Sequence, residues 1–203
     1  SRQVAASAAA ATAATGVATS TAALADVVSG LGSDNTLRMK LSAFVLAGRL
    51  ERVVELANER LQRMGDGRFH LAHSDRLASG GRRSGLGLVV QDEWTGQVRD
   101  TATLSGGESF MASLALALGL ADAVREESGG IDLHTLFIDE GFGSLDGESL
   151  EQVMEVLDQL QDGGRAVGVV SHVPALRDRI PAQVQVDKTR RGSTVRRVTG
   201  PAA

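Results

Sequence analysis

The sequence contains no cysteine and no tyrosine, and it has only three prolines, one tryptophan and five phenylalanines. Without cysteine the chain can form neither disulfides nor thiolate metal sites. No stretch approaches the roughly 20 apolar residues that a membrane span requires, so no membrane partner is expected. The chain starts at Ser1, and its alanine-rich beginning lacks the charged segment and leucine-rich segment of a signal peptide. These absences favour an internal fragment of a soluble, cytoplasmic protein.

Size and charge narrow the class of protein further. A chain of 203 residues that is 42% hydrophobic can bury one substantial core. Its net charge of -4 argues against electrostatic wrapping of nucleic acid over the whole surface. The basic residues are nearly all arginine and can still gather on one face, so charge alone leaves DNA binding undecided.

The first 64 residues indicate two helices separated by a break. Residues 1–31 are rich in Ala, Thr and Val, with small apolar residues at helical spacing, which favours a narrow helical arm over a frayed tail. The break "GSDN" at 32–35 supplies a cap for a long amphipathic helix that runs from Leu37 to Met64. We therefore expect residues 1–35 to be the end of a coiled-coil arm and a linker, and residues 36–203 to form the main domain.

The middle of the chain changes to a pattern of short strands. The stretches "GDGRFHLAHSD" and "GLGLVVQDEWTGQVRD" predict antiparallel strands with tight turns. His70 and His73 are three residues apart in a strand, so they face opposite sides and are not expected to share a metal ion. The "GLG" lacks the third glycine and the following helix of a dinucleotide-binding fingerprint.

The second half predicts an α/β fold with a parallel core. We expect a helix at 105–124, a buried strand at 133–139, a helix at 147–162 and a buried strand at 166–170, which together make a βαβ unit. The segments "AQVQVDK" and "TVRRVT", joined by "TRRGS", then predict a closing antiparallel hairpin.

Two adjacent acids end the first strand of that unit, in "TLFIDEGFGSLD". The carboxyl end of a strand in an open α/β sheet is where ligands bind. Asp139 and Glu140 are neighbours at such an end and point in different directions, so one can hold a metal while the other acts on water. A solvated strand end is the alternative if the pair is taken by itself.

A glycine pair opens the predicted helix in "TLSGGESFMASLALALGL". Ser105 followed three residues later by Glu108 is a capping box. The box does not explain Gly106 and Gly107, which are poor helix formers. They leave the first-turn amides bare, so that a phosphate can approach them where the helix dipole favours an anion.

A histidine follows the second predicted parallel strand, in "AVGVVSHV". An isolated histidine there is usually a surface residue. The ends of the two parallel strands share one edge, however, so His172 is expected to lie near Glu140 and to sense a phosphate or an attacking water.

The order of "LSGGE", the two acids, "SLD" and the strand-terminal histidine resembles the ATP-binding cassette ATPases. The chain resembles the SbcC family of bacterial DNA repair exonuclease subunits over roughly residues 36–190. The resemblance is carried by the sequence segments "LSGGESFMASLALALGLADAV", "LFIDEGFGSLD" and "VGVVSHVPALRDRIP". The resemblance implies that Asp139 holds Mg²⁺, Glu140 is the general base and His172 is the switch histidine. It also implies a signature motif (Ser105, Gly106, Gly107, Glu108) and a D-loop that includes Ser144 and Asp146.

No G-x-x-x-x-G-K-[ST] phosphate loop occurs in the sequence. The resemblance implies that this loop lies in a separate N-terminal lobe, so that the chain is the C-terminal lobe of a split ATPase head and is inactive alone. The implied cofactors are ATP and Mg²⁺. The implied partners are the N-terminal lobe, a second copy in an ATP-joined homodimer, an SbcD-type metallophosphoesterase and double-stranded DNA in the nucleoid. The candidate DNA contacts are Arg82, Arg83, Arg190 and Arg191.

Three alternatives remain. A chromosome-organising head of the SMC type shares "LSGGE" and a split head, although "DEGFGSLD" differs from its continuation. A transporter nucleotide-binding subunit is disfavoured because its phosphate loop lies in the same short chain. An inactive lobe is disfavoured because both hydrolytic positions are filled.

Overall fold

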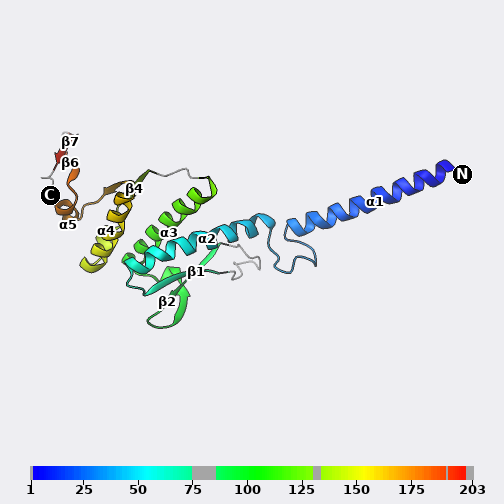
Figure 1. The fold of residues 1–203 in the computed structure, drawn as a ribbon, viewed down its shortest axis with the longest axis horizontal. Coiled ribbons are helices and arrows are strands. Elements are labelled where there is room, and N and C mark those ends of the chain that lie inside the picture. The colour runs from blue at the N-terminus through cyan, green and yellow to red at the C-terminus, as the bar shows by residue number, and fades with distance from the viewer. Residues whose placement is uncertain (1, 75–85, 130–133, 191, 200–203) are drawn as a thin grey trace. The chain divides into compact units, whose positions relative to one another are not determined.

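A computed structural model describes residues 2–74, 86–129, 134–190 and 192–199 (Figure 1). These residues form two compact units. The first unit comprises the chain up to Leu104 together with Ala112–Ile131, and the second comprises Ser105–Met111 and the chain from Asp132 onward.

The first unit begins with helix α1, Arg2–Val28, which confirms the helix predicted at the start of the chain. Its described side chains are exposed. Four threonine hydroxyls donate back to the carbonyl oxygen four residues earlier, for example Thr12 to Ala8 at 2.9 Å and Thr15 to Ala11 at 2.8 Å. These local bonds satisfy the hydroxyls without any partner helix.

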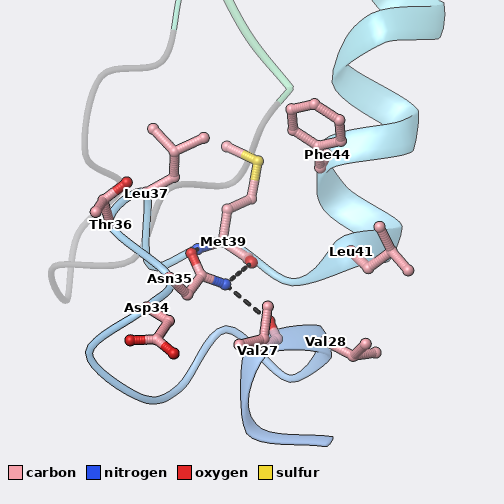
Figure 2. A pocket seen from close by; sticks show the side chains of 9 residues that line it. All are labelled: Val27, Val28, Asp34, Asn35, Thr36, Leu37, Met39, Leu41 and Phe44. Carbon is pink, nitrogen blue, oxygen red and sulfur yellow. Dashed lines mark hydrogen bonds between the residues drawn. The ribbon is translucent and has the colours of Figure 1, made fainter. Parts of the chain in front are cut away.

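The segment after α1 is held by Asn35 rather than by a helix cap (Figure 2). The Asn35 side-chain amide donates to the carbonyl oxygens of Val27 and Met39, both at 2.8 Å. The second helix begins only at Leu41, six residues after Asn35, so the expectation that "GSDN" caps it is wrong. That helix, α2, spans Leu41–Met64, and its preceding residue Lys40 makes no side-chain cap.

A shallow pocket of about 250 Å³ lies where α1, this segment and the start of α2 meet (Figure 2). Its lining is mainly apolar and includes Val27, Leu37, Leu41 and Phe44. All four side chains are exposed in the chain.

The core of the first unit forms where α2 packs on the later turns of α3, Gly106–Glu127 (Figure 1). A Cβ at Gly119 would lie 2.5 Å from the Val53 carbonyl oxygen and 2.8 Å from the Ala57 amide, so only glycine fits this crossing. Arg52 pairs with Glu126 across the same two helices at 2.8 Å. This hydrogen bond lowers the pKa of Glu126.

The predicted antiparallel strands are confirmed as one sheet in the order β1–β2–β3, with bounds Phe69–Ser74, Gly87–Asp92 and Gln97–Asp100. Asp92 is buried and accepts a charge-assisted bond from Arg68 at 3.0 Å, which lowers the pKa of the Asp92 carboxyl. The two histidines of β1 have separate partners. His70 lies 3.2 Å from the Asn58 amide, and His73 lies 3.2 Å from the Glu51 carboxylate.

The second unit contains the predicted βαβ core. Strand β4, Thr135–Asp139, and strand β5, Ala166–Val170, pair in parallel, and helix α4, Gly147–Asp162, connects them and contacts β5. The strands are less buried than predicted. Phe137 is 77% exposed and lies over Gly168, and Thr135 and Asp139 on the same face of β4 are exposed as well.

The unit ends in the predicted hairpin, with β6 at Ala182–Thr189 and β7 at Gly192–Thr199. A short helix that the sequence pattern did not predict, α5 at Pro174–Arg179, precedes the hairpin.

Two described helices, α1 over Ala6–Val28 and α3, are long and apolar enough to cross a membrane by length and composition. The expectation that no stretch approaches this limit was therefore too strict. The core helix of a soluble protein has the same length and composition, and α3 is partly buried.

Candidate functional site

The two acids lie where the chain leaves β4. Asp139 is the last residue of the strand and pairs with Val170 of β5, and the Glu140 amide donates to the Val170 carbonyl at 2.9 Å. Glu140 has φ +62° and Gly141 has φ +99°. A left-handed conformation is uncommon for glutamate and typically costs about 1–3 kcal/mol, so it persists only where neighbours enforce it. The chain thus turns sharply at the predicted catalytic carboxylate.

His172 and Glu140 are in contact, which confirms the predicted proximity of the two strand ends. His172 Nδ1 lies 3.0 Å from Glu140 Oε2. An ionised carboxylate only accepts, so Nδ1 is the donor in this pair. The other ring nitrogen, Nε2, lies near Gly143, because a Cβ added to Gly143 would be 3.5 Å from it. The side chains are 76% and 53% exposed, so solvent screens the pair and its main effect is to orient the carboxylate.

The start of α3 has the predicted capping box. The Ser105 amide donates to Glu108 Oε2 at 2.8 Å, and the Glu108 amide donates to Ser105 Oγ at 3.3 Å. The amides of Gly106 and Gly107 lie in the first turn, where no intrahelical acceptor exists. The helix start therefore keeps donors for an anion, and binding of a phosphate there stays a prediction.

The glycine pair also has a packing role that the sequence did not indicate. A Cβ at Gly107 would lie 2.9 Å from the Ser144 carbonyl oxygen, and one at Gly106 would lie 3.4 Å from the Ser144 Cβ. The close approach of the loop around Ser144 is a second reason for glycine at the start of α3.

The predicted D-loop, Ser144 to Asp146, begins at the last residue of a short 3-10 turn, Phe142–Ser144, and ends at the residue before α4. Ser144 Oγ donates to the Gly141 carbonyl at 2.7 Å, which closes the turn directly after Glu140. Asp146 caps α4 by accepting from the Ser149 amide at 2.8 Å, and this hydrogen bond lowers the pKa of Asp146. The sequence-predicted D-loop residues thus shape the backbone beside the acids.

Two phenylalanines belong to the same cluster and were missed by the sequence analysis. Phe110 of α3 and Phe142 have ring centroids 5.0 Å apart at an interplanar angle of 60°. Phe142 is 1% exposed, and a Cβ at Gly141 would lie 2.2 Å from Phe110 Cδ2. The available signal was the glycine directly after the acid pair, which indicates a backbone that only glycine adopts.

A magnesium site at Asp139 fits the chemistry of the residues present. The carboxylate is exposed at the strand end, and Mg²⁺ prefers oxygen ligands. Among the described residues no group of three His, Cys, Asp or Glu could hold a metal by itself. Mg²⁺ usually takes one or two carboxylates and completes its shell with waters and substrate phosphates, so one carboxylate is sufficient on this side.

The candidate DNA contacts are only partly described. Arg190 is exposed and directly follows β6. Arg82, Arg83 and Arg191 lie outside the described residues.

Solved structures of SMC proteins share this fold. One describes ATP-driven dimerization and DNA-stimulated activation of SMC ATPases; it matches with a TM-score of 0.57 at 14% identity, covering 77% of this chain and 89% of that one. An Smc head domain from Pyrococcus furiosus, bound to the C-terminal domain of ScpA, matches with a TM-score of 0.53 at 14% identity over 81% of this chain and 39% of that one. The chain has the fold of an SMC/ABC-type ATPase head.

Sequence comparison narrows the class. Residues 82–159 match the family described as SbcC/RAD50-like, Walker B motif. The SbcC subunit of the SbcCD nuclease from Treponema pallidum is 47% identical over 85% of this chain, and its counterpart from Vibrio cholerae is 49% identical over 87%. The chain belongs to the SbcC family, and it spans 16% and 17% of the length of these two relatives.

Proposed function

We propose that this chain is the C-terminal lobe of the split ATPase head of an SbcC-type nuclease subunit. The observation that carries the proposal is the contact of Glu140 with His172 at the shared edge of β4 and β5, beside Asp139. Three side chains meet at this edge. Asp139 is suited to bind a cation, Glu140 is suited to act as a general base, and His172 orients Glu140.

Each residue has a defined part in hydrolysis of ATP. Asp139 would hold Mg²⁺, which would neutralise charge at the phosphates when bound. Glu140 accepts the proton of the attacking water, and its orientation is set by His172. Positioning and electrostatic stabilisation dominate catalysis of phosphoryl transfer, so the rigid turn after β4 is a direct part of the mechanism.

The helix start acts on a second head. The bare amides of Gly106 and Gly107, with Ser105 and the positive end of the α3 dipole, form an anion site. We infer that it receives the γ-phosphate of ATP held by another copy, so that ATP joins two heads. Ser144 lies against this helix start, and Asp146 caps the following helix α4.

The remaining partners follow from the family. The N-terminal lobe supplies the phosphate loop that this sequence lacks, and the uncovered face of β4 and β5 around Phe137 is a surface that it can cover. The head dimer controls access of double-stranded DNA to an SbcD-type metallophosphoesterase in the cytoplasm, at the nucleoid. A DNA-organising head without a nuclease partner is the second candidate, because the similar solved structures are SMC heads.

Reconstitution tests the proposal. The purified chain should not hydrolyse ATP, and mixing it with the N-terminal lobe should give magnesium-dependent turnover. Adding the metallophosphoesterase should then produce ATP-dependent DNA cleavage, which the SMC-type alternative does not predict. Hydrolysis of ATP by the isolated chain would contradict the assignment as half of a site.

A further inference from the structure

The backbone that carries Glu140 requires an external clamp. Glu140 and Gly141 both have left-handed φ values, +62° and +99°, and glutamate avoids this region without support. Behind the turn, the Glu140 amide is fixed to the Val170 carbonyl at 2.9 Å. In front of it, the ring edge of Phe110 lies directly against the Cα of Gly141, so close that a Cβ would overlap Cδ2 at 2.2 Å.

The phenyl ring is itself well supported. Phe110 packs on Phe142 with ring centroids 5.0 Å apart, and Phe142 is almost completely buried. Gly141 therefore lies between the ring of Phe110 and the strand that precedes it, and it has little room to change its φ. Because Glu140 directly precedes Gly141, a shift of this turn redirects the Glu140 carboxylate away from His172.

We propose that Phe110 is a positioning residue for ATP hydrolysis: its ring holds the Glu140–Gly141 turn so that the Glu140 carboxylate addresses the attacking water. This inference rests on the proposed role of Glu140 as the general base. Phe110 lies in the first turns of α3, five residues after Ser105, which caps that helix. The ring therefore also links the helix start, which receives the phosphate of the facing head, to the base of its own head.

The contact of Phe110 with Gly141 explains why position 110 is aromatic, which neither helix capping nor core formation requires. An apolar side chain at position 110 would satisfy a core helix, but an aromatic ring supplies a flat edge that fits over a glycine Cα. The matching requirement at position 141 is a residue without a Cβ. The phenylalanine of "ESF" (108–110) and the glycine of "EGF" (140–142) thus form one contact between segments that are distant in the sequence.

The test uses the full-length subunit assembled with its nuclease partner, with kcat and KM for ATP measured separately. Phe110→Ala should lower kcat by about 10²-fold, because misplacement of a reacting group by about 1 Å has an effect of that size. KM for ATP should stay within about twofold, since the residues that bind ATP are unchanged. Phe110→Leu, which keeps part of the contact, should give an intermediate kcat and serves in place of Phe110→Ala if that variant does not fold.

A second comparison separates positioning from general loss of structure. In a Glu140→Gln background the Phe110 substitution should have no further effect on kcat, because its target is already absent. Leu118→Ala, which removes a buried side chain elsewhere on α3, is the matched control. It should lower the melting temperature and leave kcat of the folded protein unchanged.

The outcomes distinguish this inference from the proposed function. If Phe110→Ala keeps wild-type kcat, or lowers it by the same factor with Glu140 and with Gln at position 140, Phe110 does not act through Glu140. If Glu140→Gln itself turns over ATP normally, the proposed base is wrong and the inference fails with it. If Phe110→Ala lowers kcat at constant KM, and the same substitution has no effect on kcat in the Glu140→Gln background, the result supports both the inference and the proposed function.

Discussion

His172 Nδ1 lies 3.0 Å from Glu140 Oε2, so a residue just beyond β5 orients the residue that directly follows β4. Both partners of this contact belong to the second unit. The contact therefore forms within the fold of this unit, and we expect that binding of ATP is not needed to create it.

Loss of the histidine should reduce turnover without preventing ATP binding. In the reconstituted head, His172→Ala should lower kcat by up to about 10²-fold because the Glu140 carboxylate loses its orienting donor. His172→Gln keeps a donor and should retain more activity. Steady-state kinetics with both variants tests this, and equal kcat for Ala and wild type would exclude an orienting role.

Substitution of Ser105 separates capping from phosphate binding. Ser105→Ala should lower stability by about 1 kcal/mol through loss of the cap. Ser105→Arg should lower it similarly and, in addition, block the ATP-joined dimer, because a bulky side chain fills the anion site. Chemical denaturation and size-exclusion chromatography of the reconstituted heads measure the two effects. If a folded Ser105→Arg head still dimerises with ATP, the motif around Ser105 only caps α3 and does not bind phosphate.

The glycine pair can be tested on the chain itself. Gly107→Ala places a Cβ 2.9 Å from the Ser144 carbonyl oxygen, and such overpacking typically costs about 1–3 kcal/mol. Gly147→Ala is the matched control, since Gly147 also begins a helix and no atom lies within 4 Å of its added Cβ. Urea unfolding should show a loss for the first variant and none for the second.

The cap of α4 predicts a dependence of stability on acid pH. The Ser149 amide lowers the pKa of Asp146 below its usual value of 3.8, so the ionised carboxylate favours the folded state. Its contribution is fully present above about pH 4 and is lost as the pH falls through the lowered pKa. Asp146→Ala should therefore be less stable than wild type at pH 7, with a smaller difference near pH 3. Asp146→Asn, which still caps, should show less dependence. A difference that is constant from pH 7 to pH 3 would contradict this account.

The sequence was sufficient for the elements with strong local signals. Periodicity, the glycine-rich turns and the capping box located α3, the βαβ unit, both groups of antiparallel strands and the contact between Glu140 and His172. Local pattern could not show that Asn35 binds Val27 and Met39 instead of capping α2, because that choice depends on the position of α1.

Burial was also difficult to predict, because it depends on what covers a strand. The apolar run that ends at Asp139 indicates burial on both faces, yet Phe137 is exposed in this chain. The contact of Phe110 with Gly141 joins residues 31 positions apart and has no periodic signature. Tertiary packing, rather than local propensity, determines each of these features.

Glu140 is proposed as the general base of an ATP-joined head. The most direct measurement is size-exclusion chromatography of reconstituted Glu140→Gln heads with ATP and Mg²⁺, together with their rate of ATP hydrolysis. We expect a stable dimer and a rate lowered by about 10²–10⁴-fold, because the amide keeps the shape of the site and cannot accept the proton. A variant that stays monomeric with ATP and hydrolyses it at the wild-type rate would contradict the claim.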